Sequence, residues 1–74
     1  MSKYNLLWIY INATFKKQEV DSLTLSFDDI HTILSFPIDH SFLNAKRELL
    51  TYGYEVKKIS LKNRQIIFQK SPSK

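Results

Sequence analysis

The chain has 74 residues, of which 43% are hydrophobic and 14% aromatic, and these values fit one small domain with a real core. It contains no cysteine, which excludes disulfides, thiolate metal sites and a cysteine nucleophile. Residues 1–43 carry three cations and five anions, whereas residues 44–74 carry eight cations and two anions. A basic half is typical of proteins that contact a polyanion, although a basic protein without such a partner would show it too.

The first segment, residues 4–15, fits two structures. Its run 6–11 is almost wholly apolar and rich in residues that favour strands, so a strand is one reading. The other reading is a helix, because large side chains recur at helical spacing, namely Tyr4, Leu7, Trp8, Ile11 and Phe15. We predict a helix with Tyr4, Trp8 and Tyr10 in the core; in the alternative, the surplus aromatic side chains form a dimer seam.

A strand and a helix are expected next, with no loop between them. Leu23, Leu25 and Phe27 alternate with serine and threonine, which predicts a half-buried strand. Ser26 can then cap a helix whose first turn holds Asp28 and Asp29, where the helix dipole favours anions. One face of that helix is apolar, formed by Phe27, Ile30, Ile33 and Leu34. Pro37 ends it, because proline disfavours helical backbone in the residue before it.

A second helix is predicted from Asp39 to Tyr52, with Asp39 or Ser41 as the N-cap and Gly53 as the stop. At about 100° per residue, four polar side chains fall within about 40° of one another. These are His40, Asn44, Arg47 and Thr51.

Arginine and asparagine are the side chains best suited to base edges in the major groove. Lys46 flanks the stripe and is a candidate for phosphate contact. The stripe therefore indicates a DNA-reading helix, although most polar helix faces bind nothing and the nearby Glu48 would repel phosphate.

The segment 54–70 predicts a basic β-hairpin with its turn near Lys62 and Asn63. Four apolar residues share one face by parity, namely Ile59, Leu61, Ile66 and Phe68. A bulge near Lys57–Lys58 would bring the start of the first strand into phase with them. The candidates for phosphate contact are Lys57, Lys58, Lys62 and Arg64. Alternatively, these lysines only protect a sheet edge from aggregation.

The predicted order is therefore helix, strand, helix, helix, strand, strand. This is the order of a winged helix-turn-helix, an α+β fold with a small antiparallel sheet. We expect residues 1–70 to form a single winged-helix-like domain and residues 71–74 to form a flexible tail. If the first segment were a strand, the result would be a four-stranded α+β domain.

The motifs of catalysis are missing. His31 and His40 lack the spacing of metal ligands, Ser41 has no recognisable triad around it, and there is no glycine-rich phosphate loop. We therefore expect neither an enzyme nor a cofactor or metal site. No segment reads as a targeting signal or a membrane span, so we expect no membrane contact and a cytoplasmic location.

The stretch "LTLSFDDIHTILSFPIDHSF" resembles a family of small uncharacterised bacterial and phage domains with the pattern L-S-F-x-E-I-E-x-I-L-G-x-P-L-P. The family's later pattern, W-L-x-A-G-W/Y-x-V, is matched by Leu50, Gly53, Tyr54 and Val56. The chain departs from the family at Ser35, where the family has glycine, and it lacks a W-W-x-N segment. Because the shared positions are core and turn residues, the resemblance bears on the fold and implies no binding or catalytic residue.

These observations favour a small protein that binds double-stranded DNA, with a regulatory role and encoded by a phage or plasmid. The alternative is a protein-interaction module, such as a phage-encoded inhibitor of a host nucleic-acid enzyme or defence system. The sequence leaves open whether the chain forms a homodimer.

Overall fold

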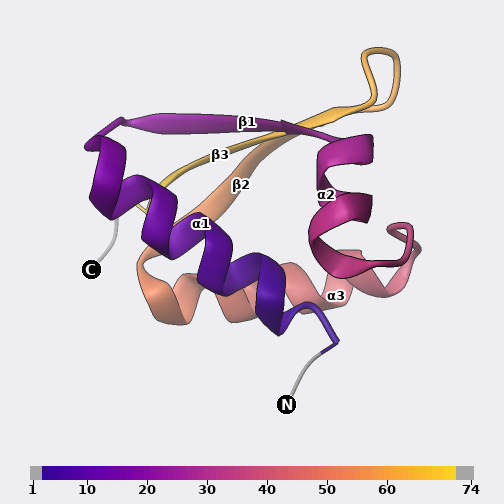
Figure 1. Cartoon of the computed structure of the whole chain (residues 1–74), viewed down its shortest axis with the longest axis horizontal. Coiled ribbons are helices and arrows are strands. Elements are labelled where there is room, and N and C mark those ends of the chain that lie inside the picture. The colour runs from indigo at the N-terminus through magenta and orange to yellow at the C-terminus, as the bar shows by residue number, and fades with distance from the viewer. Residues whose placement is uncertain (1–2, 72–74) are drawn as a thin grey trace.

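Helix α1 (Asn5–Gln18), strand β1 (Ser22–Ser26) and helix α2 (Phe27–Leu34) form the first half of the chain. Helix α3 (Ser41–Ala45), the 3-10 helix η1 (Lys46–Tyr52) and strands β2 (Tyr54–Ser60) and β3 (Gln65–Lys70) form the second. The computed structural model describes residues 3–71. Figure 1 shows α1 in front of the space between the sheet and the α3–η1 segment. The α+β class is confirmed, and the first segment is a helix as predicted.

Helix α1 is the centre of the core. Its buried side chains, together with that of Tyr4 just before it, are the five that the helical spacing predicted, namely Tyr4, Leu7, Trp8, Ile11 and Phe15. The prediction that Tyr10 is a core residue is wrong, because its side chain is 42% exposed. Two residues correspond to about 200° on a helix, so Tyr10 faces away from Trp8. The ring of Phe15 stacks on that of Tyr54, with centroids 4.5 Å apart, and this contact joins α1 to the start of β2.

Strand β1 passes into helix α2 at Ser26, which is both the last strand residue and the predicted N-cap. The Ser26 Oγ accepts a hydrogen bond from the Asp29 backbone N–H (2.9 Å), and the Asp29 carboxylate accepts one from the Ser26 N–H (3.2 Å). This reciprocal pair is a capping box, which satisfies two donors that the helix start would leave unpaired. The helix ends at Ser35, whose φ of 69° lies in the left-handed region.

The sheet is antiparallel, with strand order β1-β3-β2. Leu25 pairs with Ile66, and Ile66 also pairs with Ile59 on the other side. The predicted bulge is confirmed, because the register shifts between Val56 and Lys58. The prediction that Leu61 shares the buried face is wrong: β2 ends at Ser60, and the Leu61 side chain, in the turn, is 78% exposed.

The predicted helix from Asp39 to Tyr52 is shorter and changes type. Its α-helical part covers only Ser41–Ala45, and the chain then tightens into the 3-10 helix η1. Gly53 ends the segment as predicted, with a φ of 92°. Of the predicted flexible tail 71–74, residues 72–74 lie outside the described part of the chain. Ser71 is described, and its backbone N–H donates to the Gly53 carbonyl (2.9 Å).

Candidate binding surface between helix α3 and the hairpin

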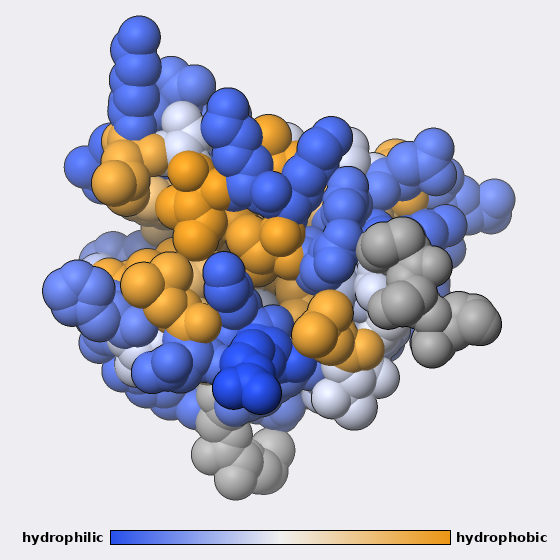
Figure 2. Space-filling model, turned by 180° about the vertical axis from the view of Figure 1, so that it is seen from behind, coloured by the Kyte–Doolittle hydropathy of each residue, from blue (hydrophilic) through white to orange (hydrophobic). Residues whose placement is uncertain are grey.

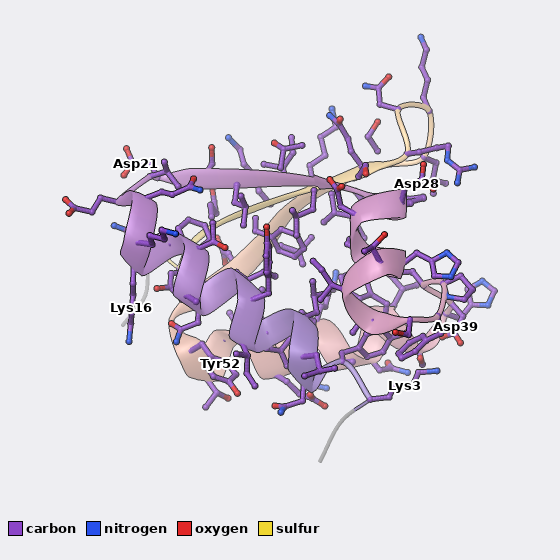
Figure 3. All side chains as sticks on the ribbon, viewed as in Figure 1. Lys3, Lys16, Asp21, Asp28, Asp39 and Tyr52 are labelled. Carbon is purple, nitrogen blue, oxygen red and sulfur yellow. The ribbon has the colours of Figure 1, made fainter. Side chains whose placement is uncertain are left out.

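The start of α3 is fixed by Asp39. Its Oδ1 accepts hydrogen bonds from the Ser41 backbone N–H (2.9 Å) and from the Tyr4 hydroxyl (3.1 Å). The Ser41 hydroxyl also donates to this oxygen (2.5 Å), and Lys3 Nζ lies 3.1 Å from Oδ2. The labelled Lys3 and Asp39 lie close together beside α2 (Figure 3). The prediction of Asp39 or Ser41 as the N-cap is wrong, because the N-cap position is His40, which makes no side-chain cap hydrogen bond. Asp39 lies one residue earlier and accepts from the N–H of Ser41, the first residue of α3.

These partners also set the charge of Asp39. The Ser41 hydroxyl, then Lys3 and the Ser41 backbone N–H, hold the pKa of the Asp39 carboxyl well below its ordinary value. The carboxylate is thus charged at neutral pH, but its charge is offset by the ammonium group of Lys3, which also lies 5.5 Å from the Tyr4 ring centre.

The change to 3-10 geometry breaks the predicted polar stripe. A 3-10 helix has about three residues per turn, so side chains three apart lie in line. Arg47 is therefore in line with Leu50, and Thr51 is in line with Glu48. His40, Asn44, Arg47 and Thr51 are all exposed, and Lys46 is half-buried, but the four do not form the single row that a continuous α-helix would give.

Glu48, expected to repel phosphate near this stripe, is turned toward α1. Its Oε1 accepts a hydrogen bond from Trp8 Nε1 at 3.0 Å. This contact gives the buried indole N–H its partner. The carboxylate is therefore directed away from the side on which Arg47 and Leu50 lie.

The hairpin keeps its cations on the surface. Lys57 and Lys58 lie at the bulge, and Lys62 and Arg64 lie in the turn 61–64; all four are exposed. Arg64 has partners, since its guanidinium is 3.7 Å from the Asp28 carboxylate and 5.9 Å from the Phe27 ring centre. Within residues 3–71, no carboxylate pairs with the other three, nor with Lys46 or Arg47.

A groove of about 650 Å³ lies between α3 and the hairpin. Its lining is mostly apolar and consists of Phe27, Ile38, Asp39, His40, Phe42, Leu43, Ile59, Leu61 and Ile66. Seen from behind, the molecule shows a band of hydrophobic surface with hydrophilic residues above and below it (Figure 2). No pattern in the sequence predicts this groove.

Two leucines of the groove lining, Leu43 and Leu61, are exposed, as is Leu50 on η1, and none of the three belongs to the core. The exposed fractions are 49% for Leu43, 51% for Leu50 and 78% for Leu61. The sequence did carry one signal for two of them, because Leu43 and Leu50 are seven residues apart and would share one side of an α-helix. Together with Arg47 they give this side of the segment a mixed apolar and basic character.

Within residues 3–71, no three acidic or histidine side chains converge as metal ligands would, and no helix has the length and apolar character needed to cross a bilayer. The resemblance to small bacterial and phage domains stays a prediction. Comparison with protein-family models, with curated proteins and with solved structures finds no match for this chain.

Proposed function

We propose that this chain is a small DNA-binding protein of the winged helix-turn-helix type, with a regulatory role. In this reading, α2 and the α3–η1 segment are the helix-turn-helix, and the β2–β3 hairpin is the wing. The sequence of elements and the strand order β1-β3-β2 support it. Asn44 and Arg47 would read bases, and the hairpin would contact the phosphate backbone.

The observation that carries this proposal is a set of cations for which the described part of the chain offers no acidic partner. Six side chains on η1 and the hairpin have no acidic partner within residues 3–71: the five predicted contacts Lys46, Arg47, Lys57, Lys58 and Lys62, and Lys70 at the end of β3. Cations beside a helix with base-reading side chains are suited to phosphates. Lysines on an edge strand can also protect the sheet from aggregation without any acidic partner, so the salt dependence of DNA binding must distinguish the two roles.

The first test is a fluorescence-polarisation titration of the full chain against mixed-sequence duplex DNA at about 50, 100 and 200 mM salt. We expect micromolar binding that weakens steeply with salt. If the chain does not bind the duplex even at the lowest salt concentration, the proposal that it is a DNA-binding protein is wrong. If binding is found, selection of a preferred site follows, and Asn44→Ala with Arg47→Ala should relax that preference; an unchanged preference would contradict a reading role for α3–η1.

The second candidate function is a protein-interaction module, and the apolar groove favours it. A surface that only follows phosphates needs no hydrophobic floor. Tight binding of a protein partner at a salt concentration that abolishes DNA binding would distinguish this function from the first.

A further inference from the structure

We propose that the groove between α3 and the hairpin binds an acidic amphipathic helix of a partner protein. Two or three large aliphatic or aromatic side chains of that helix would lie in the groove, between Leu43 and Leu61. The carboxylates on its other faces would meet the surrounding lysines and Arg47. This inference does not depend on the proposed DNA binding, although the two surfaces overlap.

The shape and lining of the groove favour a helical peptide. Its volume of about 650 Å³ lies within the range of known ligand sites, and seven of its nine lining residues are apolar. Exposed apolar surface that is surrounded by polar residues is typical of interaction sites. Exposed Leu43 and Leu61 stand on opposite walls, one on α3 and the other in the hairpin turn. This is the arrangement by which a groove holds the apolar face of an amphipathic helix.

The charge around the groove determines which helix fits. Lys62 directly follows the lining residue Leu61 in the turn, and it has no acidic partner within residues 3–71. Lys58 precedes the lining residue Ile59 in the edge strand β2, so its side chain leaves the sheet on the opposite face. Asp39 is the only carboxylate of the lining, and its charge is offset by Lys3. An approaching peptide therefore meets a positive rim, which attracts acidic side chains and repels basic ones.

The same features disfavour two other occupants. A second copy of this chain carries a net charge of +4 and would bring like charges to a basic rim. Duplex DNA could contact the lysines, but its phosphates would lose water over the apolar floor without gaining hydrogen bonds there.

The test begins with selection from a library of random 16-residue peptides displayed on phage, with the full chain as bait. The enriched peptides should be net negative, with large apolar residues at helical spacing. One of them, made synthetically, is then titrated against the chain at about 200 mM salt, where weak phosphate-type contacts are largely lost.

Leu43→Ser and Leu61→Ser should each weaken peptide binding at least about tenfold, because both anchors are exposed and lie outside the core. The matched control is Leu6→Ser, since Leu6 is 59% exposed on α1 and does not line the groove; its effect should stay within about twofold. Circular dichroism and thermal melting should show that all three variants fold.

Three outcomes would overturn the proposal. The selection could yield no peptide that binds at micromolar concentration, or peptides without acidic residues. The leucine variants could bind the selected peptide as well as the unchanged chain does. Finally, Leu43→Ser and Leu61→Ser could weaken duplex DNA binding as much as peptide binding, which would assign the groove to nucleic acid.

Discussion

Replacing two hairpin lysines, Lys57→Gln with Lys62→Gln, tests whether the hairpin follows phosphates. Both side chains are exposed, and neither has an acidic partner within residues 3–71. Each phosphate contact releases counterions from the DNA, so log affinity falls with log salt with a slope of about −0.9 per contact. The substitutions therefore change a slope that can be calculated from the number of free cations.

The five predicted contacts on η1 and the hairpin, Lys46, Arg47, Lys57, Lys58 and Lys62, have no acidic partner within residues 3–71 and give an expected slope of about −4.5 for the unchanged chain. A fourfold rise in salt, from about 50 to 200 mM, should then weaken binding about 500-fold. The double variant keeps three of the contacts, so its slope should be about −2.7 and the loss about 40-fold. Fluorescence polarisation at four or five salt concentrations separates the two slopes.

The matched control is Lys16→Gln with Lys17→Gln, which removes the same charge from the C-terminal end of α1. Figure 3 shows Lys16 at the opposite end of the molecule from the hairpin turn. This variant should keep the slope of the unchanged chain. If it flattens the slope as much as the hairpin variant does, binding depends on net charge alone. If the hairpin variant keeps the full slope, the hairpin does not contact phosphates.

Three further predictions concern stability. Ser35→Gly should stabilise the chain by roughly 0.5–1 kcal/mol, because Ser35 has a φ of 69° that glycine adopts without strain. The measurement is a rise of a few degrees in Tm. No rise, or an equal rise with Ser35→Ala, would contradict this reasoning. Gly53→Ala should cost about 1 kcal/mol or more in urea unfolding, from the φ of 92° alone, since an added Cβ meets no atom within 4 Å. Asp39→Asn should lower Tm at pH 7. Because the pKa of Asp39 is lowered on folding, its contribution is present above the ordinary pKa of 3.8 and is lost as pH falls through the lower folded pKa. The difference in Tm between the Asn variant and the unchanged chain should therefore shrink below pH 3.8, and a difference that persists in acid would show that charge is not the cause.

The sequence predicted the boundary of a helix correctly where the backbone conformation at that boundary depends on a single residue type. Ser26 marked the start of α2 because a serine hydroxyl caps a helix, and Gly53 marked the end of η1 because it adopts positive φ freely. The bulge at Lys57 followed from parity, since Val56 and Ile59 must both face the core. These predictions need no knowledge of distant parts of the chain.

The change from α3 to η1 could not be predicted in this way. The residues of η1 include good α-helix formers, so propensity alone favours a continuous α-helix. The groove was missed for a related reason: its walls come from α3 and the hairpin, and its hollow depends on how far apart packing holds them. Exposed leucines are common on proteins, so an exposed Leu61 indicates a binding surface only because it lines the groove.

The junction at Ser26 has a mechanical consequence. Strand β1 enters α2 without a hinge, and the backbone N–H of Phe27 donates to the carbonyl of Arg64 at 2.8 Å. The Arg64 side chain reaches back to Asp28, so the hairpin turn is attached to the start of α2 by backbone and side chain together. These two contacts hold the hairpin turn beside the start of α2. A ligand that touches both the turn and α2 must therefore be long enough to cover the distance that these contacts set between them.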